Sequence, residues 1–519
     1  MAPGGRQGPW ARNRDDQPVY TAAAPQYPRV MGAEVSKKNF TRAQRTSYRE
    51  RLNQNLEAFE AFLADGHFAS SGTIGLELEL NLANGDFTPA MRNAAVLESI
   101  ADEAFQTEIG AFNIELNHPA LEVAGRGLRE LEESLRDQLN RADARADEAG
   151  VDLLMTGILP TLQPEQLQDG QWMSAGKRYA ALNTSVLQAR GEDVLIDITG
   201  REHLRFYAPT IAPEAACTSV QLHVQLSPGE FAPAWNAAQI IAGPQLALAA
   251  NSPVFLEKVL WHETRIELFQ QSIDTRAPEM RAQGVRPRVW FGERWITSIF
   301  DLFEENVRYF PALLPELAKR GPEKTRAGSP QLHELRLHNG TVYRWNRPIY
   351  DPGQEMPHLR LENRLLPGGP SVLDTVANAA FFFGLVRRLR TAQRPLWSRM
   401  AFGTAAENFT ACARDGLHAT VYWPGVGEIP VSELIVRHLL PLAAEGLADL
   451  GVDEAVAARY LDVLRERAGT EQNGALWQIA ALDRLECHGL DRRHALQEMT
   501  RLYWEHMHRS GPVHEWPLP

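Results

Sequence analysis

Four segments of the sequence alternate between apolar and polar residues, and their polar positions carry side chains that can bind metal ions and phosphate. Residues 74–82 place apolar side chains on one side and Glu77 and Glu79 on the other, because positions two apart share a face of a strand. Carboxylates and histidine are ligands suited to Mg²⁺ or Mn²⁺, and arginine binds phosphate oxygens. The polar positions of the other three segments are Asn113, Glu115 and Asn117, then Gln221, His223 and Gln225, and then Arg360, Glu362 and Arg364.

Together, the four polar faces favour a nucleotide and metal site over an ordinary exposed sheet. Taken singly, each face also fits the water-facing side of an antiparallel sheet, and Glu362 with Arg364 also fits a structural ion pair. Lysine, which is common on exposed edge strands, is absent from all four faces. Crowded carboxylates repel one another unless a cation lies between them. The sequence has neither the Walker phosphate-loop pattern nor the dinucleotide glycine pattern, so ATP would bind without a phosphate loop.

The elements that must position these residues mix strands and helices without regular alternation, which predicts an α+β fold with an antiparallel sheet. Strands are expected at 74–82, 112–123, 219–226, 332–337 and 358–366, and helices at 36–64, 91–106, 128–150, 233–250 and 372–390. Beyond residue 431 the chain is expected to be almost entirely helical. Lys177, Arg178 and Tyr179 are expected on a loop that either contacts water or binds a substrate anion.

Composition and charge exclude several classes of protein. The 519 residues include 53 Lys and Arg against 65 Asp and Glu, and the net charge of −12 disfavours nonspecific nucleic-acid binding and docking on anionic membranes. No apolar run approaches the roughly 18 residues of a membrane helix, and residues 1–30 lack the apolar core of a secretory signal. Three cysteines without a C-x-x-C pair indicate a reducing cytoplasm. We expect a disordered tail at 1–35, a catalytic domain at 36–430, and a helical region at 431–519 packed on that domain.

Seven short motifs occur in order between Gly72 and Gln478. They are Gly75-Leu76-Glu77-Leu78-Glu79, residues 112–123, residues 219–225, Asn251-Ser252-Pro253, residues 361–364, Asn408 with residues 413–417, and residues 473–475 with Gln478. Together they resemble the motifs of the second family of glutamate–cysteine ligases, which are carboxylate–amine ligases related in fold to glutamine synthetase and the guanido kinases. In the third motif, that family often has a second histidine where this chain has Gln221.

The resemblance implies an antiparallel sheet that forms a concave active-site funnel flanked by helices. It implies that ATP phosphorylates the γ-carboxylate of glutamate to an acyl phosphate, which an amine such as cysteine attacks to give an amide. Phosphoryl transfer of the guanido-kinase type, a non-catalytic binding or regulatory protein on the same fold, and a metal-dependent hydrolase stay open as alternatives. The expected partners are glutamate and an amine, without nucleic acid or membrane. The chain is expected in the cytoplasm, alone or as a homo-oligomer.

The resemblance also implies roles for individual residues. The divalent ions, Mg²⁺ or Mn²⁺, that bridge the ATP phosphates would be held by Glu77, Glu79, Glu115, His223 and Glu362. Glu79, Glu362 and Arg364 would be catalytic, with Arg364 stabilising charge on the transferring phosphoryl group. Arg364, Asn251 and Arg414 would contact ATP or a substrate carboxylate. Alternatively, Asn251 caps a helix end and Arg414 forms a structural ion pair.

Overall fold

The computed structural model describes residues 35–37, 39–70, 72–168, 170–318, 324–325, 328–353 and 355–519. The predicted tail at 1–35 therefore lies outside the described residues, except for Val35. Within the described ranges, no helix is both long enough and apolar enough to cross a membrane.

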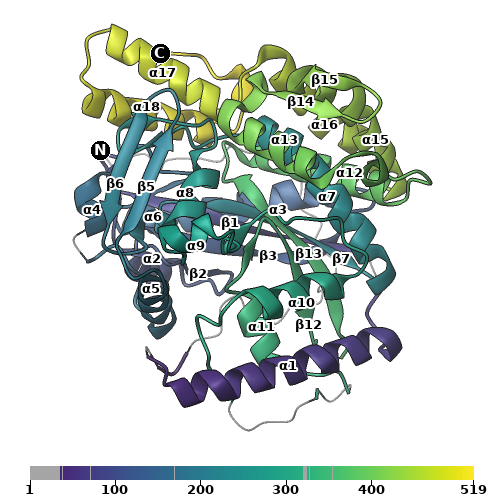
Figure 1. Cartoon of the computed structure of the whole chain (residues 1–519). Coiled ribbons are helices and arrows are strands. Elements are labelled where there is room, and N and C mark those ends of the chain that lie inside the picture. Colours follow the sequence, from purple (N-terminus) through teal and green to yellow (C-terminus); the bar gives the residue numbers. More distant parts are fainter. Residues whose placement is uncertain are drawn as a thin grey trace.

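A seven-stranded sheet lies at the centre of the described structure (Figure 1). Its strands follow the order β12-β13-β7-β1-β3-β2, with β4 paired to β1, and these pairings are antiparallel. The strands are β1 (Thr73–Ala83), β2 (Phe105–Thr107), β3 (Asn113–Glu122), β4 (Asp152–Leu154), β7 (Ser219–Leu226), β12 (Asn346–Asp351) and β13 (His358–Pro367). The prediction of mixed helices with an antiparallel sheet is confirmed, and the four polar segments lie on four adjacent strands.

The register of the sheet brings the polar positions of these strands into one patch. Glu79 of β1 lies opposite Glu115 of β3, and Gly75 of β1 lies opposite His223 of β7. On the other side of β7, His223 lies opposite Glu362 of β13. Because residues opposite one another in a strand pair point to the same face, the acids and the histidine share one side of the sheet.

The other face of the sheet forms the hydrophobic core. Leu76, Leu78 and Leu80 of β1 and Leu222 of β7 are at most 1% exposed. Behind them lie α7 (Pro228–Ala249), α12 (Val372–Arg390) and α3 (Gly127–Glu148), which contact the strands. Helix α7 is buried along nearly its whole length because it is apolar on all sides. Burial of each leucine contributes about 1.5–3 kcal/mol, so this packing fixes which face of the sheet remains for chemistry.

Helices α5 (Lys177–Arg190), α10 (Ile299–Tyr309) and α11 (His333–Asn339) contribute residues around the polar face, and α1 (Arg42–Asp65) packs on two of them. Helix α1 contacts α10 and α11, and all three lie in the lower part of Figure 1. Helix α1 begins after Thr41 rather than at the expected residue 36, because Thr41 and Gln44 form a capping box.

Three local predictions around the polar face are wrong. The helix expected at 91–106 is α2 (Asn93–Ile100) followed by strand β2. The strand expected at 332–337 is helix α11, because leucines spaced by three and then two residues fit either structure over so short a run. Lys177, Arg178 and Tyr179 form the first turn of α5 rather than a loop.

Beyond residue 431 the chain is almost entirely helical, as predicted. The helices are α14 (Val431–Leu434), a π-helical turn at Ile435–Leu439, α15 (Leu440–Asp449), α16 (Glu454–Thr470), α17 (Gly474–Cys487) and α18 (Arg492–His508). Arg467 of α16 donates to Asp374 of α12 at 2.8 Å, and Asn473 donates to the carbonyl of Ala247 at 2.9 Å. These buried hydrogen bonds attach the C-terminal helices to the helices behind the sheet.

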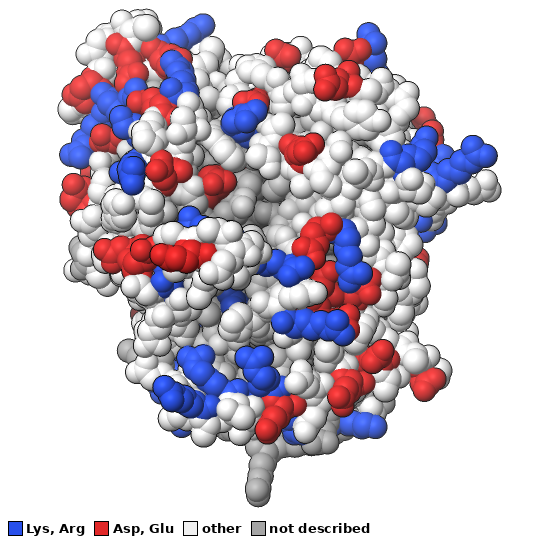
Figure 2. Space-filling model, viewed as in Figure 1, with Lys and Arg blue, Asp and Glu red and all other residues white. Residues whose placement is uncertain are grey.

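The remaining elements connect these parts. They are α4 (Pro164–Gln168), α6 (Ala212–Ala215), α8 (Thr264–Ser272), α9 (Pro278–Ala282), α13 (Phe402–Asp415), the antiparallel pairs β5 (Val194–Thr199) with β6 (His203–Ala208), β8 (Val254–Phe255) with β9 (Lys258–Val259) and β14 (Thr420–Trp423) with β15 (Gly427–Pro430), the parallel pair β10 (Val289–Trp290) with β11 (Tyr343–Arg344), and 3-10 turns at Leu396–Arg399, Gly416–His418 and Val513–Glu515. Acidic and basic side chains are interspersed over the face shown in Figure 2.

Candidate active site

The polar face of the sheet forms one wall of a cavity of about 920 Å³. Small-molecule sites are commonly about 300–1,000 Å³, so this cavity is large enough for more than one small substrate. Its other walls include Arg178 and Tyr179 from α5 and Arg336 from α11. A smaller cavity of about 60 Å³ adjoins it, and Glu108 and Arg364 line both.

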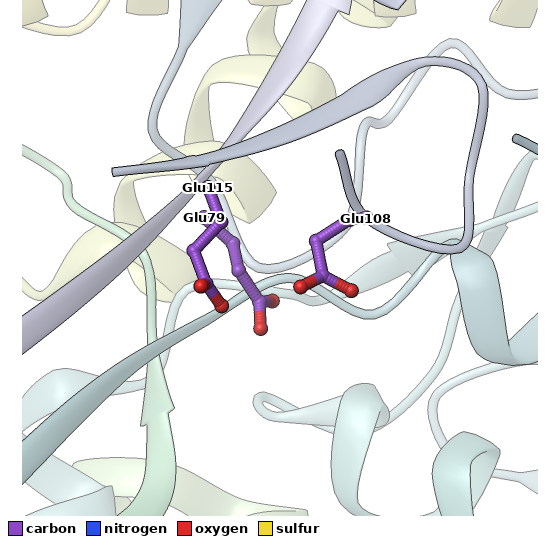
Figure 3. Close-up of side chains that lie close together, drawn as sticks. All are labelled: Glu79, Glu108 and Glu115. Carbon is purple, nitrogen blue, oxygen red and sulfur yellow. The ribbon is translucent and has the colours of Figure 1, made fainter. Parts of the chain in front are cut away.

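Three carboxylates converge where the two cavities meet (Figure 3). Glu79 projects from β1, Glu115 from the adjacent β3, and Glu108 from the turn after β2, and one oxygen of each lies within 4.8 Å of the others. Glu79 accepts a hydrogen bond from the backbone N–H of Ser219 at 2.6 Å. Glu115 accepts one from the Gln106 amide at 2.5 Å. The strand register explains why Glu79 and Glu115 meet, since they lie directly opposite one another.

The surroundings of these carboxylates oppose their ionisation. Burial, together with the charge of Glu108, raises the pKa of Glu79 to about 7. Burial and the charges of Glu77, Glu108 and Glu79 raise the pKa of Glu115 well above its usual value. Burial also raises the pKa of Glu108. Three acids this close, two of them buried, stay charged together only if a cation compensates them, so the group fits a divalent ion with oxygen ligands.

Glu77 and His223 form a second, adjacent part of the site. The Nε2 atom of His223 lies 3.0 Å from Oε1 of Glu77, but the angle is not that of a hydrogen bond. Both ring nitrogens and Oε2 of Glu77 are buried without a hydrogen-bond partner among the described residues. Gly75 lies opposite His223 in the strand pair. Unsatisfied nitrogen and oxygen atoms of this kind also suit a metal ion.

Glu362 is held by two arginines. Arg347 of β12 donates to both of its oxygens at 2.9 Å, and Arg364 donates to Oε1 of Glu362 and to Oε1 of Gln221. Burial alone would raise the pKa of Glu362, but Arg347 and Arg364 outweigh it and hold that pKa well below its usual range. Its charge is thus already balanced, and its role as a metal ligand stays a prediction.

Gln221 connects the arginine to the carboxylate cluster. Its amide nitrogen donates to Glu79 at 3.1 Å while its oxygen accepts from Arg364. An amide carries an N–H donor and an oxygen acceptor, so this one side chain contacts both neighbours. The glutamine at this position therefore orients Arg364 and Glu79 relative to one another.

The structure brings neither Asn251 nor Arg414 to this cluster, and neither is among the described residues that line the two cavities. Asn251 is fully buried behind the sheet, where its amide donates to Gly368 at 2.7 Å and to Tyr503 at 2.8 Å. Arg414, at the end of α13, is half exposed and bonds Asp415 at 2.8 Å. Their contact with ATP stays a prediction, and the geometry favours structural roles.

Sequence reasoning missed three charged groups in this site. Glu108 continues the period-two pattern of Gln106, so the signal was present but was hidden by the helix predicted at 91–106. Arg347 lies on a short strand with Pro348 at its centre, a poor strand signal, and it is opposite Glu362 only in the folded sheet. Glu214, on the four-residue helix α6, lines both cavities and has no motif around it.

Comparison with known proteins gives a family and a fold. The sequence model for glutamate-cysteine ligase family 2 matches residues 73–501. The structure is similar to that of glutamate–cysteine ligase from Francisella tularensis in complex with AMP, with a TM-score of 0.52 and 13% identity over 87% of this chain and 91% of that chain. At this identity the likeness shows a shared fold. The curated proteins give no match.

Two further solved structures are more distant. One is a bifunctional glutathione synthetase from Pasteurella multocida, with a TM-score of 0.43 and 11% identity over 90% of this chain and 55% of that chain. The other is the complex between the prokaryotic ubiquitin-like protein Pup and its ligase PafA, with a TM-score of 0.35 and 11% identity over 86% of this chain and 74% of that chain.

Proposed function

We propose that this chain, which belongs to glutamate-cysteine ligase family 2, is an ATP- and Mg²⁺-dependent ligase that joins the γ-carboxylate of glutamate to an amine. A carboxylate oxygen takes the γ-phosphoryl group of ATP, and the bond to ADP breaks. The amine nitrogen then attacks the carbonyl carbon of the acyl phosphate, phosphate leaves, and the amine loses a proton as the amide forms.

The observation that carries this proposal is the carboxylate cluster beside Arg364 in one cavity. Glu79, Glu108 and Glu115 each offer a carboxyl oxygen within 4.8 Å of the others, and Arg364 lines the same junction of the two cavities. Phosphoryl transfer needs metal ions on the phosphate oxygens and a guanidinium or similar donor on the transferring group. Where the two cavities meet lie acids that could hold such ions and the guanidinium of Arg364.

The chain's own residues divide these tasks. Glu79, Glu108 and Glu115, with Glu77 and His223 beside them, would hold the divalent ion, which supplies charge neutralisation on the phosphates when bound. Gln221 and Glu362 fix the direction of the Arg364 guanidinium. That preorganisation means that little reorientation is needed as charge develops on the phosphoryl group.

An assay of ADP, phosphate and product tests the proposal. The protein is incubated with ATP, Mg²⁺ and glutamate, and cysteine, the other common amino acids and simple alkylamines are added one at a time. Equimolar ADP, phosphate and γ-glutamyl amide are expected with at least one amine. A phosphorylated guanidine without phosphate release would show guanido-kinase chemistry, and no turnover with any acceptor would contradict the ligase.

A matched pair of variants on one strand tests the assignment of the site. Glu115→Gln removes a charged ligand from the cluster and should abolish nearly all turnover, because the metal loses one of its anionic ligands. Glu122→Gln changes the exposed acid at the end of the same strand and should leave turnover unchanged. Equal activity in both variants would contradict the metal site.

A further inference from the structure

Glu214 stands apart from the carboxylate cluster but lines both cavities. The group of acids whose oxygens lie within 4.8 Å of one another contains Glu79, Glu108 and Glu115 but not Glu214. The Oε2 atom of Glu214 is buried and has no hydrogen-bond partner among the described residues. Arg364 and Tyr343 line the same junction between the cavities.

A buried carboxylate oxygen without a donor is costly unless a ligand supplies one. Burial, with Glu108 and Glu79 nearby, raises the pKa of Glu214 to about 8. The same surroundings that disfavour a bare negative charge attract a cation. Glu214 is not one of the three acids whose oxygens lie within 4.8 Å of one another, so its oxygen remains open to a second cation.

We propose that Glu214 binds the ammonium group of the amine substrate, which gives up one proton to solvent before its nitrogen attacks, and so selects acceptors that carry a positive charge. This inference rests on the proposed ligase function. The amine must reach the activated carbonyl beside the transferring phosphoryl group. In the proposed function this group lies next to Arg364, which lines the same two cavities as Glu214. An ammonium group offers three donors and a positive charge, which match an acid oxygen that has no donor of its own.

The test compares charged and uncharged acceptors in Glu214→Gln. Methylamine and cysteine carry an ammonium group near neutral pH, whereas hydroxylamine is largely uncharged. With the acyl phosphate it forms a hydroxamate, which is measured as its coloured complex with Fe³⁺. Loss of one charge-assisted contact should lower kcat/KM for the charged acceptor used by the wild type by about 10- to 100-fold, mainly through KM. The rate of hydroxamate formation from glutamate, ATP and hydroxylamine should stay within about threefold of the wild-type rate. A change of that size is smaller than the effect of losing one charge-assisted contact.

Controls separate this role from folding, from metal binding and from the ligase itself. Glu103→Gln removes an exposed acid that lines the larger cavity and should not distinguish between acceptors. Glu214→Asp keeps the charge and should restore part of the lost affinity for the charged amine. Equal loss with every acceptor, no loss with any, or a wild type that makes hydroxamate but uses no charged amine would each overturn the proposal. A wild type that turns over neither hydroxylamine nor any amine would instead contradict the ligase function.

Discussion

Replacing Arg364 with lysine separates a catalytic role from a structural one, because the structure shows what else holds Glu362. Arg347 donates to both oxygens of Glu362 at 2.9 Å. Arg364 adds one contact to Glu362 and one to Gln221. In Arg364→Lys, Glu362 therefore keeps its bidentate partner, and the substituted side chain keeps its positive charge.

The expected magnitudes follow from these contacts. A hydrogen bond to a charged group contributes about 1.5–3 kcal/mol, and the lysine ammonium recovers part of it, so the free energy of unfolding should fall by about 1 kcal/mol or less. Lysine cannot reproduce the planar fork that contacts Glu362 and Gln221 together. If the fork also stabilises the transferring phosphoryl group, kcat should fall by about 10²-fold or more, which corresponds to about 2.7 kcal/mol. KM for ATP should change much less.

The assay combines steady-state kinetics at varied ATP with denaturant unfolding of the same preparations. Arg347→Met is the matched control, because it removes the bidentate partner of a fully buried carboxylate and should cost about 3–5 kcal/mol of stability. A near-normal kcat in Arg364→Lys, with a loss of stability as large as that of the control, would refute the reasoning.

Three further predictions concern the metal, the pH and the buried polar contacts behind the sheet. Glu108→Gln should weaken Mg²⁺ binding, measured by calorimetry, by about tenfold or more, whereas Glu122→Gln should not. Burial lowers the pKa of His338 to about 4, so the unfolded chain takes up this proton at a higher pH than the folded chain does. About 3 kcal/mol of folding stability should therefore be lost as the pH falls from about 6.5 to 4. The His338→Asn variant should not show this loss of stability in an acid-unfolding experiment. Asn251→Ala should lower the free energy of unfolding by about 3 kcal/mol, because the buried Tyr503 hydroxyl loses the amide that donates to it. KM for ATP should stay unchanged. A raised KM for ATP with unchanged stability would instead support a contact between Asn251 and ATP.

Strand periodicity explains why much of the site could be predicted. Two-residue spacing fixes which side chains share a face, so Glu77 and Glu79 could be placed together from sequence. The apolar halves of the same strands identified the core face, and that face is buried. Which strands lie next to one another depends on the tertiary fold and cannot be read from the periodicity of single strands. In the sequence this neighbourhood was implied only by the family resemblance, and the structure shows it as the strand order β13-β7-β1-β3.

The groups that sequence reasoning missed depend on distant parts of the chain. Arg347 acquires its role from a pairing with Glu362 across β12 and β13. Glu214 lies on a helix of four residues, too short for any periodic signal. Asn251 fits a substrate contact and a buried structural amide equally well as a sequence motif. Only its contacts with Gly368 and Tyr503 distinguish the two.

Two glutamates that look alike in the sequence behave in opposite ways, and this difference predicts how metal binding depends on pH. Arg347 and Arg364 overcome burial and keep the pKa of Glu362 well below its usual range, so it is charged without any metal ion. Burial and Glu108 raise the pKa of Glu79 to about 7.

Since a cation binds only the ionised form of Glu79, Mg²⁺ must displace protons from the cluster, and the affinity for Mg²⁺ should fall as the pH drops below about 7. Calorimetry in two buffers of different ionisation enthalpy would measure the released protons. Binding that releases none and stays constant from pH 8 to pH 6 would place the ion elsewhere than at Glu79.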